Sequence, residues 1–425
     1  MNQESKKWMR LDNAANIYPA ARRRGWMSLF RLSATLNEKI NPGILQRAQE
    51  ITLKRFPSMA VKLKRGLFWY YLERAEGGPQ VSCDGPYPCR SFCVKENGGF
   101  GFRVKYYRNR IALEVFHVLT DGTGGIIFLK TLVAEYLRLK HGTVIPRGQE
   151  IFDCTQAPDP LELEDSFWRY SGHISHGRSE ENAYHISGTP EEGFVNLTTG
   201  LLPVEAVKAE AQKMGVTVTE LLSSVMIRAA VRLQAAERPA RRQRPVKIMI
   251  PVNLRRFFFS RTVRNFSLYV SPGIDPRMGE YSLEEIAGAL HHQMGLALTA
   301  KQLAARFTTN VKSERNMALR IMPLFIKNFA MKCVYNLIGE RKTCTTLTNL
   351  GNVVLPDEMA AYVQRMDFVL GPLAQNPLAC ACLSYQGILY FSVCRTIQEP
   401  KWEREFFTEL VQMGIPVKIE SNMPW

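Results

Sequence analysis

The 425-residue sequence has no long hydrophobic run and no apolar segment at its start. A membrane-spanning helix needs about 18 or more apolar residues in a row, and the nearest candidate, residues 321–339, is interrupted by Pro323, Lys327 and Lys332. We expect an amphipathic helix there, with a basic helix lying on a membrane surface as the alternative. The first 13 residues resemble no secretory signal, so we predict a cytoplasmic protein.

Recognisable metal-ligand and disulfide patterns are also missing. The nine cysteines are an odd number and are scattered along the chain, so reduced thiols are expected. Cys83, Cys89 and Cys93 are close in sequence, but they lack the spacing of two intervening residues and have no histidine beside them. Because structural zinc sites depend on such spacing, we expect no bound metal.

Acidic residues are scarce in two parts of the chain. Of 425 residues, 55 are Lys or Arg and 39 are Asp or Glu, which gives a net charge of +16. Residues 228–264 contain eleven basic residues and one acidic residue, and residues 301–342 contain nine and two. Such local excess attracts an anionic partner, for example a phosphorylated cofactor or a membrane face, although a solvated basic face without a partner is an equal alternative. No nucleic-acid-binding motif is present, so that class of partner is not expected.

The remaining composition is that of a folded protein, with 46% hydrophobic and 22% charged residues. A polar, acidic stretch at 156–198 separates two richer segments, so we predict an N-terminal lobe at 1–155, a crossover linker at 156–198 and a C-terminal lobe at 199–425. Alternating strand patterns are mixed with helical patterns in both lobes. This mixture predicts an α/β (α+β) protein built as two sandwiches.

The periodicity of the apolar residues and the positions of turn residues predict the helices and strands of each lobe. In the first lobe we predict strands at 28–36 and 62–73, a helix from Pro42, a hairpin of 102–107 with 110–117, and a helix over 126–140 that Gly142 ends. In the second lobe we predict one helix that opens at Pro203 and a second that is capped by Thr217 or Thr219, followed by strands at 247–253 and 265–271. Helices are expected between 283 and 338. Strands follow at 345–351, 364–371, 381–385 and 387–394, then a helix at 402–413 and an edge strand at 416–420.

The stretch FHVLTDGTGG, residues 116–125, joins a predicted strand to a predicted helix. Alternation puts His117 on the same face as Val115, at the end of a stiff strand. The glycines allow unusual dihedrals and close approach of another molecule, and the free N–H groups of the helix start point back at the turn. This arrangement suits a neutral imidazole acting as a base. The alternative is a structural histidine, with Asp121 as an ordinary helix cap.

Three further segments accompany HVLTDG, which resembles the HxxxDG motif of the chloramphenicol-acetyltransferase-like acyltransferases. PVNLRRFFFSRTVRNFSLYV (251–270) and TNLGNVVLP (348–356) resemble segments of the second lobe in this superfamily, and RLDNAANIYP (10–19) resembles the start of bacterial alcohol O-acetyltransferase-like proteins. Condensation domains usually have a second histidine where Phe116 stands, and DFVLG (367–371) is only similar to the DFGWG loop of the plant branch.

The resemblance implies two lobes with a tunnel between them. It implies that His117 is the general base that moves an acyl group, expected to be acetyl, from a coenzyme A thioester to an alcohol or lipid acceptor. Acyl-CoA is then a co-substrate, with no permanently bound cofactor, and the chain contains no carrier domain. Asp121 is implied to be structural and paired with Arg255, with Arg264 as the second choice.

The remaining site residues are hypotheses within the same resemblance. The Gly122 N–H or the region of Thr348 and Asn349 is expected to bind the oxyanion, and Lys327 and Arg341 are expected to bind the donor phosphates. An N-acyltransferase or condensation enzyme is the alternative within the fold. A catalytically inactive protein that binds a lipid or a partner is the alternative from another class.

Overall fold

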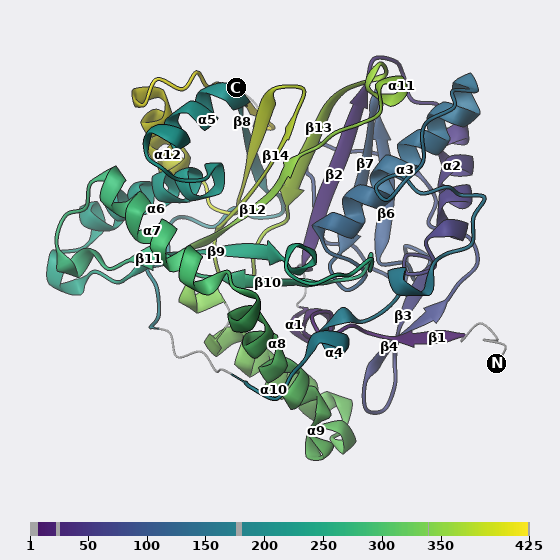
Figure 1. Ribbon diagram of the computed structural model, residues 1–425, viewed down its shortest axis with the longest axis horizontal. Helices are drawn as coiled ribbons and strands as arrows, with labels where there is room; N and C mark the ends of the chain where they lie inside the picture. Colours follow the sequence, from purple (N-terminus) through teal and green to yellow (C-terminus); the bar gives the residue numbers. More distant parts are fainter. Residues whose placement is uncertain (1–6, 23–25, 176–180, 339, 424–425) are drawn as a thin grey trace.

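The chain folds into three β-sheets with helices packed around them (Figure 1). A computed structural model describes residues 7–22, 26–175, 181–338 and 340–423. Residues 1–6 of the start, from which no secretory signal is predicted, and Gly339 of the predicted helix at 321–339 lie outside the described residues. The sheets have five, eight and three strands, and antiparallel pairs are combined with parallel ones. This is the mixed α/β architecture that the sequence predicted.

The five-stranded sheet belongs mainly to the first half of the chain. In spatial order its strands are β13 (Val363–Leu370), β2 (Leu29–Leu36), β7 (Arg110–Phe116), β6 (Phe102–Tyr107) and β5 (Ser82–Cys83). β13 comes from the other half of the sequence and pairs antiparallel with β2, with Asp367 opposite Ser33. The second half therefore completes the sheet of the first. The boundaries at 1–155, 156–198 and 199–425 stay a prediction, and β13 lies in the first sheet whatever boundary is chosen.

The eight-stranded sheet belongs to the second half. In spatial order its strands are β10 (Ser267–Val270), β9 (Val246–Asn253), β12 (Thr345–Asn352), β14 (Leu378–Tyr385), β15 (Ile388–Arg395), β8 (Asn196–Pro203) and β16 (Lys418–Ser421), with β11 (Gly273–Ile274) also paired to β9. β12 runs parallel to both of its neighbours and is irregular between Asn349 and Asn352. β13 packs against β14 and β15, so the two large sheets meet along β13 and β14.

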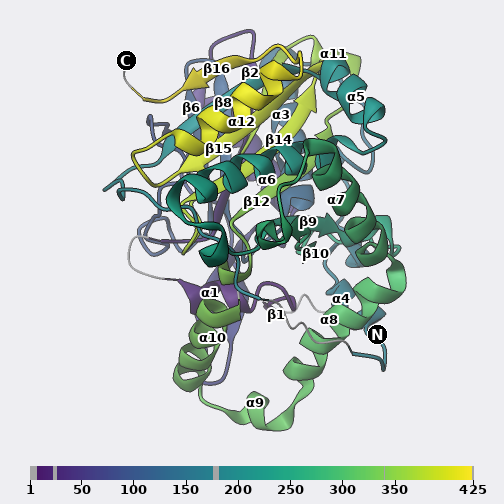
Figure 2. The same ribbon diagram turned by 90° about the vertical axis from the view of Figure 1, so that its left-hand side faces the viewer.

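Helices cover both large sheets. α2 (Pro42–Arg55) and α3 (Gly122–His141) pack together beside the five-stranded sheet, and α5 (Val204–Lys213), α6 (Val218–Glu237), α7 (Leu283–Ala297) and α12 (Lys401–Gln412) form the layer on the eight-stranded sheet (Figures 1 and 2). The other helices are α1 (Ile17–Ala21), α4 (Ser166–Tyr170), α8 (Ala300–Arg315), α9 (Met317–Ile321), α10 (Leu324–Ile338) and α11 (Asp357–Ala360). The third sheet is β1 (Trp8–Arg10), β4 (Tyr70–Arg74) and β3 (Val61–Arg65).

Local sequence explains where several helices begin and end. The Asn41 side chain accepts from the Ile44 N–H at the start of α2, and Thr217 forms a capping box with Glu220 at the start of α6, so Thr217 rather than Thr219 is the cap. α3 ends at Gly142, whose φ of 72° is the left-handed conformation that favours glycine. α3 begins at Gly122, four residues before the predicted start, because Asp121 caps it.

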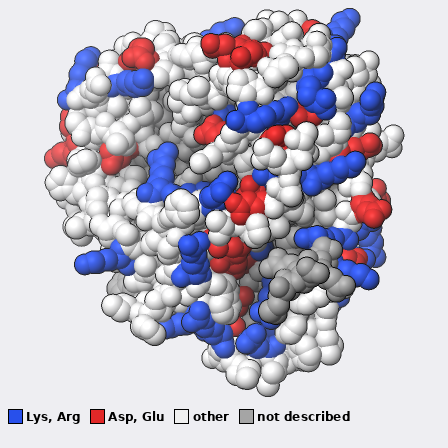
Figure 3. All heavy atoms as spheres, turned by 45° about the vertical axis from the view of Figure 1, so that its right-hand side comes forward, with Lys and Arg blue, Asp and Glu red and all other residues white. Residues whose placement is uncertain are grey.

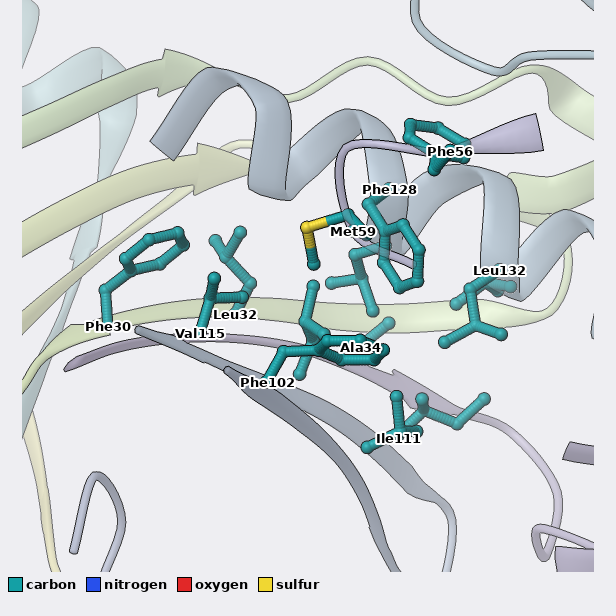
Figure 4. Close-up of a cluster of buried hydrophobic side chains, with 14 of the residues drawn as sticks. Phe30, Leu32, Ala34, Phe56, Met59, Phe102, Ile111, Val115, Phe128 and Leu132 are labelled. Atoms are coloured by element: carbon teal, nitrogen blue, oxygen red, sulfur yellow. The ribbon is translucent and has the colours of Figure 1, made fainter. Parts of the chain in front are cut away.

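The core beside the candidate site lies between α3 and the five-stranded sheet (Figure 4). Its labelled side chains come from three strands, from α3 and from the end of α2 and the loop that follows: Phe30, Leu32, Ala34, Phe102, Ile111, Val115, Phe128, Leu132, Phe56 and Met59. Burying one such large side chain contributes roughly 1.5–3 kcal/mol. α3 is buried around most of its circumference, including Phe128, Leu129, Leu132 and Val133. The last residues of β7 are therefore held rigidly.

None of the described helices is by itself long and apolar enough to cross a bilayer. α5 and α6 pass that test only when taken together, across a bend of 81°.

Candidate active site

His117 lies directly after β7, in the turn that leads into α3. Its backbone N–H donates to Ser28 O at 3.0 Å, and the Leu119 N–H donates to Phe116 O at 3.0 Å, which closes the turn. Strand pairing continues up to Phe116, which lies opposite Leu29 of β2. The histidine is thus fixed to the end of the sheet by its own backbone.

Three side chains surround the imidazole of His117. The Tyr18 ring of α1 is stacked on it, with centroids 5.1 Å apart and planes at 22°. Phe30 of β2 lies on it at 4.9 Å, tilted by 58°. Asn265, from the loop before β10, places Oδ1 3.4 Å from His117 Nδ1 and donates from Nδ2 to the His117 carbonyl at 3.0 Å. Two aromatic rings and one amide therefore set the orientation of the imidazole.

This environment keeps His117 neutral. Burial lowers the pKa of His117 below its usual 6.5, while the Asp121 carboxylate and the Asn265 hydrogen bond act in the opposite direction. Asn265 Oδ1 can only accept, so this contact is a hydrogen bond in the tautomer with the proton on Nδ1, and in that tautomer the Nε2 lone pair is free. A histidine in this state can remove a proton from a bound hydroxyl.

Asp121 is both a helix cap and one half of an ion pair. One carboxylate oxygen, Oδ1, accepts from the N–H groups of Thr123 and Gly124 at 3.1 and 3.2 Å. The other, Oδ2, accepts from Arg255 Nη1 at 2.8 Å and from the Phe266 N–H at 2.9 Å. The pair predicted between Asp121 and Arg255 is thus present, and the carboxylate has four donors. These contacts suit a structural role rather than a proton transfer.

The second choice for this partner, Arg264, lies elsewhere. Its Nη2 donates to Arg10 O at 2.6 Å and its Nε lies 3.7 Å from Asp12 Oδ2. Arg255 Nη2 donates to the Arg264 carbonyl at 2.5 Å, so the two arginines are neighbours with different partners.

The glycines of the turn let the two halves of the chain touch. A Cβ on Gly124 would lie 2.1 Å from the Val263 carbonyl and 2.1 Å from Thr120 Oγ1, and the Thr120 hydroxyl itself donates to Val263 O at 2.6 Å. A Cβ on Gly122 would lie 2.8 Å from Leu350 Cδ2 of β12. Among the described residues no acceptor is bonded to the Gly122 N–H, which is the first of α3. That group can therefore receive an oxyanion.

Thr348 and Asn349 are less directly placed. Both belong to β12, where they lie opposite Ala381 and Cys382 of β14. The Asn349 amide donates to Thr219 Oγ1 at 3.0 Å and its oxygen accepts from the Gly351 N–H at 2.8 Å. The structure thus brings the β12 segment to the turn through Leu350, while the Asn349 side chain is directed to α6.

Lys327 and Arg341 lie in different environments. Lys327 Nζ donates to Phe68 O at 2.7 Å, and burial lowers its pKa, with Arg320 adding to the effect. The Arg341 side chain is exposed, and its carbonyl accepts from the Ala183 N–H at 3.0 Å. Their donor-binding role stays a prediction.

Much of the first basic window is neutralised within the protein. Five of its eleven cations form ion pairs with acidic residues from elsewhere in the chain: Arg228, Arg232, Arg255, Arg261 and Arg264. On the face drawn in Figure 3, blue and red side chains are interspersed. The net charge counted along the sequence therefore overstates the free positive charge of residues 228–264.

Three residues of the site had no role assigned from sequence. Tyr18 and Asp12 belong to the segment RLDNAANIYP, and Asn265 belongs to RNFSLYV, both of which carried the resemblance. Asp12 is buried and accepts from Asn265 Nδ2 at 3.1 Å. The sequence marked both segments through the resemblance alone, and nothing in it indicated that these three residues would meet at His117.

Neither of two surface hollows is lined by His117. One is lined by residues including Lys39 and Arg108 and the other by residues including Pro272 and Arg306. The predicted tunnel stays a prediction. In the described part of the chain no group of three or more His, Cys, Asp or Glu side chains is placed to hold a metal ion.

Several solved structures share this fold. No protein-family model matches the sequence, and no curated protein matches it either. Polyketide synthase associated protein 5 from Mycobacterium tuberculosis is similar with a TM-score of 0.59 and 12% identity, over 95% of this chain and 96% of its own. The starter condensation domain of rhizomide synthetase, solved with C8-CoA and Leu-SNAC, has a TM-score of 0.60 and 12% identity, over 96% of this chain and 95% of its own. The trichothecene 15-O-acetyltransferase from Fusarium sporotrichioides has a TM-score of 0.57 and 12% identity, over 97% of this chain and 98% of its own.

These similarities extend over nearly the whole length of each chain. The protein thus has the two-lobed chloramphenicol-acetyltransferase-like fold that the sequence resemblance predicted.

Proposed function

We propose that this protein is an acyltransferase that moves an acyl group from a coenzyme A thioester to an alcohol hydroxyl, with His117 as general base. The observation that carries the proposal is the neutral imidazole at the end of β7, whose Nδ1 faces Asn265 Oδ1. A neutral base in the same turn as the free N–H of a helix start is suited to acyl transfer.

In the proposed reaction His117 Nε2 accepts the proton of the acceptor hydroxyl while the hydroxyl oxygen attacks the thioester carbon. The negative charge moves to the carbonyl oxygen, where the Gly122 N–H donates to it. The carbon–sulfur bond then breaks, and the imidazolium returns the proton to the departing thiolate. The products are an ester and free coenzyme A, so the enzyme needs no covalent intermediate and no further reactant.

Support for the donor comes from two structural neighbours. The rhizomide synthetase domain was solved with C8-CoA, and the Fusarium enzyme is named as an O-acetyltransferase. For this chain we propose acetyl-CoA or a medium-chain acyl-CoA. Of the two cations proposed for the donor phosphates, Arg341 is exposed, whereas Lys327 must first leave Phe68 O. A small alcohol or lipid is the proposed acceptor.

An N-acyltransferase or condensation reaction is the second candidate, since the structural neighbours include condensation domains. Against it, the position where condensation domains usually have another histidine is occupied by Phe116, which is buried in the core. A catalytically inactive binding protein is the third candidate.

A direct assay separates these candidates. Purified protein is incubated with acetyl-CoA or octanoyl-CoA and a panel of alcohols and amines, and both free coenzyme A and acylated product are followed by chromatography and mass spectrometry. Thiol-reactive dyes are unsuitable because Cys83 and Cys93 are exposed. Esters formed by the wild type and lost in His117→Ala support the proposal. Formation of amides alone supports the second candidate. Release of free coenzyme A by the wild type at the same rate as by His117→Ala supports the third.

A further inference from the structure

α9 and α10 present an apolar surface to solvent at one end of the molecule. Figures 1 and 2 both place α9 at the lower extremity, away from the two large sheets. We call this the α10 surface, and its exposed apolar side chains are Met317, Leu319, Ile321, Phe325, Ile326 and Phe329, joined by Leu67 and Trp69 of the β3–β4 loop. Phe325 and Phe329 are 64% and 72% exposed, which is unusual for adjacent large apolar residues.

Two polar side chains in the first half of α10 face the protein instead. Lys327 Nζ donates to Phe68 O at 2.7 Å and Asn328 Nδ2 donates to the Tyr70 hydroxyl at 2.9 Å. Phe325 and Phe329 are four residues apart and so lie on one face of the helix. Between Phe325 and Phe329 the helix therefore exposes large apolar side chains and turns two polar ones inward, the reverse of a normal surface helix.

The β3–β4 loop belongs to the same surface because it is bonded to α10. The Leu324 N–H donates to Leu67 O at 2.8 Å, and this bond joins the start of the helix to the loop. Leu67 is 72% exposed and Trp69 46% exposed. Tryptophan with its ring partly exposed beside phenylalanine is typical of a membrane–water interface.

Positive charge borders this apolar area. Arg320 and Lys332 are exposed on α9 and α10, and Arg65 is exposed opposite Tyr70 in the β3–β4 register. The described acidic residues of these segments are engaged elsewhere, since Glu314 accepts from Asn13 Nδ2 at 2.7 Å and Glu73 pairs with Lys64 at 3.2 Å. In Figure 3 the lower end of the molecule shows white atoms with blue ones beside them.

We propose that the α10 surface docks onto an anionic lipid membrane. Phenylalanine, leucine and tryptophan enter the boundary between headgroups and acyl chains, and Arg65, Arg320 and Lys332 contact the lipid phosphates. An apolar area bordered by cations, where the described residues Glu314 and Glu73 already have partners, fits a negatively charged lipid surface. The docked surface is one helix away from the candidate site, because α10 packs against α1, which holds Tyr18 on His117.

Vesicle flotation of the full chain tests the proposal. We expect binding to vesicles of phosphatidylcholine with phosphatidylserine, weaker binding to phosphatidylcholine alone, and loss of binding as salt is raised. The double variant Phe325→Ser, Phe329→Ser should bind the anionic vesicles more weakly by about tenfold or more, because two apolar rings are removed. Arg320→Glu with Lys332→Glu should lower binding only at low salt.

Matched controls lie on other parts of the surface. Phe259 is 69% exposed and Arg241 and Arg242 are exposed, so Phe259→Ser and the double variant Arg241→Glu, Arg242→Glu should bind like the wild type. Equal losses in the test and control variants would overturn the proposal, as would the absence of vesicle binding. A dimer in sedimentation that the Phe325, Phe329 variant abolishes, without vesicle binding, would assign the surface to a second copy. The inference does not depend on the acyltransferase activity, and turnover of a water-soluble alcohol should be unchanged in Phe325→Ser, Phe329→Ser.

Discussion

Arg255 and Asp121 form an ion pair between the two halves of the chain, with 2.8 Å between Nη1 and Oδ2. Both side chains are largely buried, and the same carboxylate caps α3. The pair therefore fixes the turn that holds His117 to the loop that supplies Asn265. This relationship makes the stability of the fold and the geometry of the candidate site depend on one contact.

Breaking this pair should destabilise the protein. Asp121→Ala or Arg255→Ala leaves a buried charge without its partner, which costs roughly 3–5 kcal/mol. The double variant should lose much less stability than the sum of the two single losses, because the same ion pair is broken in each single variant and in the double variant. Chemical denaturation measures each free energy of unfolding. The exposed pair Lys64 and Glu73 is the control, and its removal should change stability by about 1 kcal/mol or less. Additive losses at Asp121 and Arg255 would mean that the two residues act independently.

Removing the proposed base should affect turnover far more than folding. His117→Ala should lower kcat by roughly 10²- to 10⁴-fold, since the backbone contact of His117 with Ser28 O remains. Steady-state kinetics and a thermal unfolding curve on the same sample make the comparison. His141→Ala, at a histidine that pairs with Glu38 on the surface, should retain activity. Unchanged turnover in His117→Ala would exclude the mechanism.

The pH dependence of the reaction should have its acidic limb below 6.5. Burial lowers the pKa of His117 in the folded protein, so the imidazole stays neutral at pH 7 and activity falls only when the pH drops through the lowered value. For the same reason His117 binds a proton more readily in the unfolded chain than in the folded protein. The contribution of His117 to the free energy of unfolding is therefore present above pH 6.5 and is lost as the pH falls below it. The pH profile of kcat/KM locates the limb. A limb above 6.5 would contradict a partly buried, neutral base.

Asn265 should act as a positioning residue. In Asn265→Ala the acceptor at Nδ1 is lost, so kcat should fall while KM for the donor changes little. Because this hydrogen bond raises the pKa of His117, the acidic limb should also move to lower pH. A purely structural role would leave the limb in place. The pH profile of the variant is therefore the decisive measurement.

Gly124 should tolerate no side chain. A Cβ there would lie 2.1 Å from the Val263 carbonyl, which is backbone and cannot move aside cheaply. Gly124→Ala should thus cost about 1–3 kcal/mol or more and lower activity by shifting the turn. Gly148→Ala, where the added Cβ has no neighbour within 4 Å, is the control and should be nearly neutral. Equal stability of the two variants would mean that the lobes do not touch at this turn.

The sequence by itself determined the local frame of the site. Alternation along β7 and the glycines after it predicted a strand that ends at a turn. A helix cap at Asp121 was the alternative that the sequence offered, and the Asp121 side chain does accept from the first N–H groups of α3. The capping box of Thr217 and Glu220 is likewise a local pattern. These features depend on residues within about one helical turn of each other, where spacing alone fixes which atoms can meet.

The resemblance to a superfamily added the pairing of Asp121 with Arg255, which no spacing could have given. Neither source indicated that β13 would cross into the sheet of the first half, because an apolar strand pattern does not specify its partner. In the first basic window, residues 228–264, the excess of positive charge suggested an anionic partner, and the structure showed that Arg228, Arg232 and Arg261 are paired with distant acids.

Only the tertiary structure decided what surrounds His117. Asn265 is 148 residues from it in the sequence, and Tyr18 reaches it from α1. The outward direction of Phe325 and Phe329 was also decided there, because Lys327 and Asn328 found acceptors on the β3–β4 strands and their loop. In each case the partner lies far along the chain, and its position depends on how whole elements pack. Local periodicity carries no information about that packing.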